Sequence, residues 1–281
     1  MNKRIIARLD IKGPHLVKGI HLEGLRVLGN PEDFAKYYYE NGADEIIYMD
    51  VVASLYDRNS LSDIITKTAR QIFIPLTVGG GLRTLDDINS VLRAGADKVC
   101  INTAAIRNPD FIKQASRKFG SSTIVVAIEA IQQPNGDYLC YVDNGREHTG
   151  IDAVEWAQKV QELGAGELIN TSVDNEGTGN GFNIGLCKAV STNISIPVIA
   201  HGGAGQATDI LDVCNETNCD AVAIASILHY EAIEVLKDSV AANEIGNVDF
   251  LKSGRGNKNI EAITIKSLKE ILYKKNINVR L

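Results

Sequence analysis

The sequence contains only five cysteines among its 281 residues, and none of them forms a Cys-x-x-Cys pair. An odd, scattered set of this kind predicts neither a disulfide framework nor a zinc site, and it is typical of buried thiols in a reducing compartment. No apolar run approaches the roughly 20 residues that a membrane-spanning helix requires. The first ten residues carry charges where the apolar core of a signal peptide would continue. These absences predict a cytoplasmic protein without a metal site.

The chain also lacks an excess of basic charge. Its 29 Lys and Arg residues stand against 35 Asp and Glu residues, which gives a formal net charge of −6. That balance disfavours a general nucleic-acid-binding surface, although a local basic pocket for an anionic substrate remains compatible with it. With 44% hydrophobic and 23% charged residues the composition is that of a globular protein, and the length fits one large α/β domain.

Short apolar runs alternate with helical patterns along the chain. Eight runs are rich in Val and Ile and apolar nearly throughout, as buried parallel strands are. They are Ile5–Asp10, Glu45–Asp50, Ile74–Val78, Lys98–Asn102, Thr123–Glu129, Glu167–Ser172, Pro197–His201 and Ala221–Ala225. Helix starts lie between them, for example Asn30 before Pro31 and Thr84 before an acidic first turn. Eight such alternations predict a (β/α)₈ TIM barrel, and a doubly wound open sheet is the alternative.

An internal repeat relates the two halves of the chain. Residues 75–81 (PLTVGGG) reappear as residues 197–203 (PVIAHGG), and residues 42–46 (GADEI) reappear as residues 164–168 (GAGEL) at the same spacing. The first and fifth strands, and the fourth and eighth, repeat at nearly that spacing. Two (β/α)₄ halves in a closed barrel are related by a pseudo-twofold axis, so the repeat predicts paired functional sites on opposite sides of the barrel mouth.

The segment 241–261 does not fit the repeat. It is polar and contains several glycines, and it precedes a last helix expected at about residues 263–274. We interpret it as a surface insertion within a single domain that spans residues 1–281.

Two carboxylates occupy equivalent places in the repeat, because Asp10 ends the first strand and Glu129 ends the fifth. Catalytic groups of TIM barrels lie at the C-terminal ends of the strands. Two carboxylates that face each other there suit general acid–base catalysis, in which one donates a proton while the other accepts one. The alternative is that each carboxylate accepts hydrogen bonds from loop amides and has a structural role.

Glycine-rich turns follow the third and the seventh strand, at residues 79–81 and 202–205. Each turn precedes a helix, so backbone amides and the helix N-terminus can bind an anion. The residue pairs 102–103 and 225–226 end the next strand in each half and would complete each site. Because the arrangement occurs twice, it predicts a ligand with two phosphates.

Four ionisable residues stand at the beginning of strands and should converge at the N-terminal end of the barrel. They are Arg4, Glu45, Lys98 and Glu167. Unpaired buried charge costs several kcal/mol, so these side chains are expected to pair with one another. The residues themselves leave two interpretations open, a stabilising ring of ion pairs and a gate to a central passage.

The combined motifs resemble the cyclase subunit of imidazole glycerol phosphate synthase, over nearly the whole chain apart from the late insertion. The matching segments are residues 3–10 (KRIIARLD), 77–81 (TVGGG), 97–105 (DKVCINTAA), 164–167 (GAGE), 171–172 (TS), 201–205 (HGGAG) and 279–281 (VRL). The resemblance implies a barrel enzyme of histidine biosynthesis that has no cofactor and works with a glutaminase partner. Ammonia from the partner would cross the barrel and react with a bis-phosphorylated ribulosyl aminoimidazole nucleotide. The products would be imidazole glycerol phosphate and an aminoimidazole carboxamide ribotide.

The resemblance also implies roles for individual residues. Asp10 and Glu129 would be the catalytic acid and base. The phosphate contacts would be Gly81, Asn102, Thr103, Gly203, Ala225 and Ser226. The substrate site at the mouth would include Lys18, Thr171, Glu176 and His201. The ammonia gate would be Arg4, Glu45, Lys98 and Glu167, and Asp97 would face the glutaminase.

The chain departs from the family pattern at the barrel mouth. Glu129 stands where the family has aspartate, Arg8 where a cysteine is usual, and His201 where a serine is usual. Such changes resemble a paralogous branch found with surface-polysaccharide genes, in which the barrel conducts ammonia to a separate amidotransferase that makes an acetamidino sugar. This is the alternative function. A related sugar-phosphate isomerase is disfavoured, because an isomerase needs no gated floor.

Overall fold

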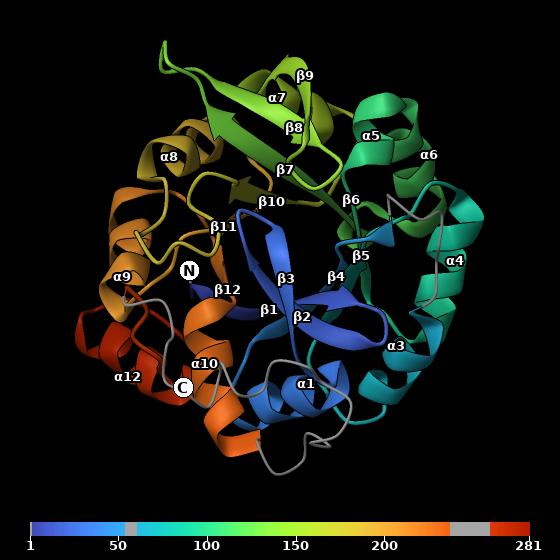
Figure 1. Ribbon diagram of the computed structural model, residues 1–281. Coiled ribbons are helices and arrows are strands. Elements are labelled where there is room, and N and C mark those ends of the chain that lie inside the picture. Colours follow the sequence, from blue (N-terminus) through green and yellow to red (C-terminus); the bar gives the residue numbers. More distant parts are fainter. Residues whose placement is uncertain (1, 54–60, 237–258) are drawn as a thin grey trace.

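The computed structural model describes residues 2–53, 61–236 and 259–281, and eight of its strands form a closed parallel barrel surrounded by helices (Figure 1). The barrel strands are β1 (Arg4–Lys12), β4 (Glu45–Asp50), β5 (Leu76–Gly79), β6 (Lys98–Ile101), β7 (Ile124–Gln132), β10 (Glu167–Ser172), β11 (Val198–His201) and β12 (Ala221–Ile224). Their order is β10-β11-β12-β1-β4-β5-β6-β7, and parallel pairing of β7 with β10 closes the ring. The predicted (β/α)₈ barrel is confirmed, and the open sheet is excluded.

Helices cover the outside of the barrel on all sides (Figure 1). They are α1 (Pro31–Glu40), α3 (Ser62–Ala69), α4 (Leu85–Ala94), α5 (Thr103–Arg107), α6 (Asp110–Phe119), α7 (Ala153–Glu162), α8 (Ile184–Asn193), α9 (Ala207–Glu216), α10 (Ser226–Leu236) and α12 (Ile265–Lys274), with a 3₁₀ turn at Ser121–Thr123. Thr84 begins α4 with a capping box, in which its side chain and that of Asp87 each accept from the other's backbone N–H. Residues 241–258 of the predicted insertion lie outside the described residues.

Two β-hairpins that the sequence analysis did not predict extend from the barrel. β2 (His15–Ile20) and β3 (Glu23–Gly29) follow β1, and β8 (Tyr138–Val142) and β9 (Glu147–Asp152) follow β7. β2 pairs antiparallel with β1, and β8 pairs antiparallel with β7. The β2–β3 hairpin lies over the centre of the barrel in Figure 1, and the β8–β9 hairpin lies at its rim. Since β1 and β7 carry Asp10 and Glu129, each candidate carboxylate has a hairpin beside it.

Alternate residues of each barrel strand point inward and form layers across the barrel. The charged residues that begin the strands form the floor, and above them lies an apolar layer. This layer consists of Ile6, Ile47, Cys100, Val125, Ala127, Ile169, Ile199, Ala221 and Ala223, with Met49 packed against it. Above it, β1 contributes Arg8 and Asp10, and β10 and β11 contribute Thr171 and His201. The interior is therefore charged at the floor, apolar in the middle and polar at the mouth.

Truncation inside the apolar layer should destabilise the barrel. Ile169 is fully buried, so Ile169→Ala is expected to lower the free energy of unfolding by about 2–5 kcal/mol because it leaves a cavity. Urea unfolding measures this change. Phe73→Ala is the control, since Phe73 is 80% exposed and its truncation should change stability by only about 0.5 kcal/mol. Equal effects of the two substitutions would contradict the layered interior.

Candidate active site at the barrel mouth

Asp10 lies at the mouth end of β1, beside Val17 of β2 and Met49 of β4. Its carboxylate is buried and accepts a hydrogen bond from Arg8 Nε–H at 2.9 Å, so the two side chains form a buried ion pair. The guanidinium also donates from Nη1 to His201 Nδ1 at 3.1 Å. Asp10 therefore belongs to a connected polar cluster rather than standing alone at a strand end.

His201 is the neutral member of this cluster. Burial lowers the pKa of its imidazole well below the usual value, and the positive charges of Arg8 and Lys18 lower it further. A neutral ring can accept a hydrogen bond from the guanidinium, which a protonated ring cannot do. Thr171 Oγ1 lies 3.2 Å from the same ring nitrogen, so the structure brings His201 and Thr171 together, and their contact with a substrate stays a prediction.

Glu129 lies at the equivalent place on β7 but has a different environment. Its Oε2 accepts a hydrogen bond from the backbone N–H of Gly145, in the turn of the β8–β9 hairpin, at 2.8 Å. Burial raises the pKa of Glu129 to about 7, and the nearby charge of Asp10 also raises it, while Arg8, the Gly145 N–H and Asn102 oppose the increase. This carboxyl group can therefore gain or lose a proton near neutral pH.

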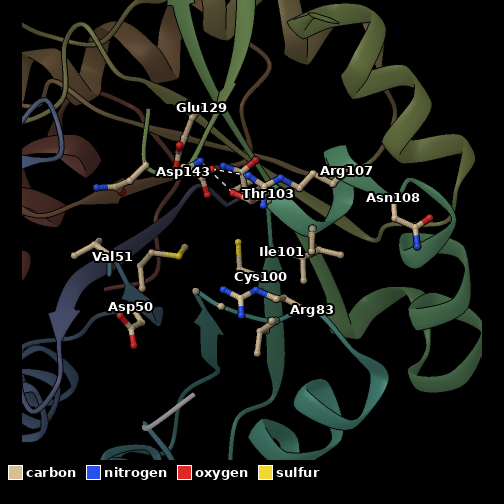
Figure 2. A pocket seen from close by; sticks show the side chains of 18 residues that line it. Asp50, Val51, Arg83, Cys100, Ile101, Thr103, Arg107, Asn108, Glu129 and Asp143 are labelled. Atoms are coloured by element: carbon tan, nitrogen blue, oxygen red, sulfur yellow. Dashed lines mark hydrogen bonds and ion pairs between the residues drawn. The ribbon is translucent and has the colours of Figure 1, made fainter. Parts of the chain in front are cut away.

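A pocket of about 280 Å³ opens beside Glu129 (Figure 2). Three of the predicted phosphate contacts line it, namely Gly81, Asn102 and Thr103. Asn102 Oδ1 is buried without a hydrogen-bond partner in the described part of the chain, so it can accept a hydrogen bond from an N–H or O–H group of a ligand. The pocket thus joins a candidate catalytic carboxyl group to one half of the predicted phosphate-binding set.

The pocket also contains polar residues that the sequence analysis missed. They are Asp50, Arg83, Arg107, Asp143 and Asn144. Arg107 Nη2 pairs with Asp143 at 2.7 Å, which links α5 to the β8–β9 hairpin. Asp50 ends β4, whereas β1 continues two residues beyond Asp10. Asn144-Gly145 is a common hairpin-turn dipeptide, so both signals were present in the sequence.

The other three predicted phosphate contacts lie outside the lining of this pocket. Gly203 follows β11 with a φ of +114°, and a Cβ added there would lie 2.0 Å from the carbonyl oxygen of Gly181. Glycine is thus required for close packing of two loops. Ala225 and Ser226 lie at the beginning of α10 and are both buried. The two sets of predicted phosphate contacts are equivalent in the internal repeat. The first set follows β5 and β6, and the second follows β11 and β12.

Lys18 and Glu176 form a second buried ion pair at the mouth. Lys18 Nζ donates to Glu176 Oε1 and to the carbonyl oxygen of Gly19. Glu176 Oε2 accepts from the backbone N–H of Leu22 at 3.1 Å. These bonds attach the β2–β3 hairpin to the loop after β10. A substrate contact by either residue stays a prediction.

The four charged residues at the barrel floor form one closed network. Arg4 bonds Glu45 and, at 2.6 Å, Glu167, while Lys98 Nζ lies 3.1 Å from Glu45 and 2.9 Å from Glu167. Burial disfavours the charged forms of the two cations, but the attraction of Glu167 and Glu45 outweighs it and raises the pKa of both Arg4 and Lys98. Two cations and two anions thus neutralise one another, and their pairing agrees with either interpretation of the ring.

Asp97 is exposed at the same end of the barrel. One oxygen of its carboxylate accepts from the backbone N–H of Leu76 at 2.8 Å, at the start of β5. Asp220 does the same for Val198 at the start of β11. Asp97 therefore has a structural role in addition to the partner contact that the resemblance implies.

Comparison with known proteins identifies the family. The model of the histidine biosynthesis protein family matches residues 4–234. The chain belongs to this family. A Legionella pneumophila protein named imidazole glycerol phosphate synthase subunit HisF is 58% identical over 205 residues, which cover 73% of this chain and 97% of that protein. Proteins of the same name from Lactococcus lactis subsp. cremoris and Methanococcus vannielii are 45% and 44% identical, covering 87% of this chain and 96% and 98% of theirs.

These relatives lend no support to the alternative role in polysaccharide modification. The resemblance to the histidine biosynthesis family, first recognised from short motifs, is confirmed. In the described part of the chain, no helix has the length and apolar character needed to cross a membrane.

The raised pKa of Glu129 should make the stability of this family member depend on pH. The pKa lies at about 7 in the folded protein against an ordinary 4.5, so the stabilising contribution is complete below pH 4.5 and lost as the pH rises through 7. Relative to Glu129→Gln, the native protein should lose at most about 3 kcal/mol of unfolding free energy over this range. Urea unfolding at several pH values measures the difference. The substitution Glu270→Gln, at an exposed site on α12, is the control and should leave the pH dependence as it is.

Proposed function

We propose that this chain is the cyclase subunit of imidazole glycerol phosphate synthase in histidine biosynthesis. It uses ammonia to convert a bis-phosphorylated ribulosyl aminoimidazole nucleotide into imidazole glycerol phosphate and an aminoimidazole carboxamide ribotide. The main support is a pair of carboxyl groups at the mouth of a barrel of this family. One accepts a hydrogen bond from a guanidinium and the other from a backbone N–H. A cytoplasmic location stays a prediction.

Asp10 and Glu129 perform the proton transfers that ring closure and cleavage require. Glu129 has a pKa of about 7, so it can donate a proton in one step and accept one in another at neutral pH. Asp10 is held in its ion pair with Arg8 and provides the second carboxylate. The longer side chain of Glu129, in place of the family's aspartate, is accommodated by its bond to the Gly145 N–H.

The two phosphates of the substrate bind on opposite sides of the mouth. Gly81, Asn102 and Thr103 hold one phosphate at the pocket beside Glu129. Gly203, Ala225 and Ser226 hold the other, at the repeat-related place. A substrate held at both ends lies across the barrel axis, where both carboxylates can reach it.

Ammonia enters through the floor of the barrel. The ring of Arg4, Glu45, Lys98 and Glu167 closes the floor through ion pairs and acts as the gate. The apolar layer above the ring suits a small neutral molecule better than the ammonium ion, because a charge would have to be desolvated there. Ammonia leaves this layer next to Arg8 and the reacting carboxylates.

A glutaminase subunit binds the floor face and supplies the ammonia. Phe73 is 80% exposed on this face and contacts Tyr39. A surface pocket of about 340 Å³ lies beside it, and its lining includes Phe73, Pro75 and Asp97. An exposed aromatic side chain next to a pocket is typical of a protein interface.

Turnover without a partner tests the proposed reaction. The purified chain is incubated with the bis-phosphorylated nucleotide and ammonium salt at alkaline pH, and substrate loss is followed by absorbance. We expect turnover that falls by about 100-fold or more in Asp10→Asn and in Glu129→Gln, because each substitution removes a proton-transfer group. Tight nucleotide binding without turnover, also in Glu129→Asp, would show that the chain is not the cyclase.

Partner binding is tested separately by calorimetric titration with the glutaminase subunit. Phe73→Asp should weaken the complex by about tenfold or more, since it places a charge in the interface core. Asp97→Asn should also weaken the complex, because it removes the charge that would face the partner. It keeps an oxygen that can still accept from the Leu76 N–H. Ammonium-driven turnover should stay unchanged in both. The control is Ile20→Asp, at a half-exposed position on the opposite end of the barrel. If this control weakens the complex as much as Phe73→Asp does, the floor face is not the interface.

A further inference from the structure

We propose that Arg8 is a positioning residue that orients Asp10 by direct hydrogen bonding and acts on Glu129 only through its charge. This inference rests on the proposed cyclase function. Arg8 departs from the family pattern, where a cysteine is usual. The structure places it in the interior, on the inward-facing side of β1 between the apolar layer and Asp10.

The geometry of Arg8 fixes one carboxylate. Its guanidinium donates from Nε to Asp10 Oδ1 at 2.9 Å and from Nη1 to His201 Nδ1 at 3.1 Å. The side chains of Arg8 and Asp10 are only 3% and 5% exposed. A planar guanidinium held at two of its nitrogens has little freedom to turn, so it sets the orientation of the carboxylate that it binds.

The internal repeat shows that Arg8 has no equivalent in the second half of the barrel. Asp10 corresponds to Glu129, and the position two residues before Glu129 is Ala127, a member of the apolar layer. Glu129 accepts a neutral backbone N–H from Gly145 where Asp10 accepts a charged donor. A symmetric scaffold therefore carries a cation beside one carboxylate only.

Other charged and titratable groups face this cluster from neighbouring elements. They are Lys18 on β2, Cys100 on β6, Glu176 in the loop after β10, His201 on β11 and His229 on α10. Lys18 and Glu176 neutralise each other in their ion pair. Burial lowers the pKa of both histidines and raises that of the Cys100 thiol to about 12, so these three groups are uncharged at neutral pH. Arg8 is thus the cation whose charge opposes the increase in the pKa of Glu129.

Substitutions of Arg8 separate its charge from its hydrogen bonds. Arg8→Met removes both, Arg8→Gln keeps N–H donors without the charge, and Arg8→Lys keeps the charge. Lys12→Met, at an exposed position on the same strand, is the matched control for loss of a cation. The carboxyl group of Glu129 is titrated by ¹³C NMR in the free protein. The pH profile of kcat and KM for the nucleotide is measured at a constant concentration of free ammonia.

We expect the apparent pKa of Glu129 to rise by about one unit in Arg8→Met and Arg8→Gln, and to stay near its native value in Arg8→Lys and Lys12→Met. The pH–rate limb due to Glu129 should move in the same direction. In Arg8→Met, kcat should fall by about 100-fold while KM changes little, because Asp10 loses its orientation and not its substrate contacts. Arg8→Lys should recover part of kcat.

Two results would overturn the proposal, namely an unchanged Glu129 titration in Arg8→Met, or equal kcat in Arg8→Met and Arg8→Lys. If Arg8→Met does not fold, as judged by circular dichroism, the same criteria apply to Arg8→Gln. The NMR titration needs no turnover. A native protein that is inactive with the nucleotide, but whose Glu129 titration responds to Arg8 as expected, would refute the proposed function and leave the electrostatic role of Arg8 standing.

Discussion

The pairing of β7 with β10 is the interaction on which the other features of this molecule depend, because it closes the sheet into a barrel with one shared interior. Inward-facing side chains from eight strands must then satisfy one another across that interior, since water reaches it poorly. Charged residues are tolerated at the floor only because two cations and two anions form a network there. Arg8 is tolerated deeper in the barrel because Asp10 and a neutral His201 receive its N–H groups.

The twofold repeat supplies a symmetric scaffold on which unequal chemistry is built. Each half contains a barrel strand that carries a carboxylate and an antiparallel hairpin that follows it. A glycine-rich turn comes two barrel strands later, after β5 in the first half and after β11 in the second. The symmetry is broken at single positions of the repeat. Arg8 in the first half corresponds to Ala127 in the second, and Asp10 corresponds to Glu129. A reaction that needs a donor and an acceptor of protons requires such inequality, since two identical carboxyl groups would compete for the same proton.

Several parts of the site could not have been predicted from local patterns. The β2–β3 and β8–β9 hairpins carry weaker signals than the barrel strands, although the Asn144-Gly145 dipeptide marked one of their turns. The partner of Glu129 is the backbone N–H of Gly145 in that hairpin, and the partner of Lys18 is Glu176, which is 158 positions away along the chain. Arg107, Asp143 and Asn144 line the pocket because the turn of the β8–β9 hairpin contacts both ends of α5, through Thr103 and Arg107.

Spacing and residue type along the sequence were sufficient to predict the barrel, its repeated halves and the charged floor. They also predicted that Asp10 and Glu129 lie at the mouth. These features follow from periodicity along the chain, which strand and helix geometry translate directly into position. Only the tertiary structure decided which charges neutralise one another, which carboxyl group titrates near pH 7, and how the hairpins cover the mouth. Those outcomes depend on burial and on contacts between residues far apart in the chain, and neither quantity is encoded in a local pattern.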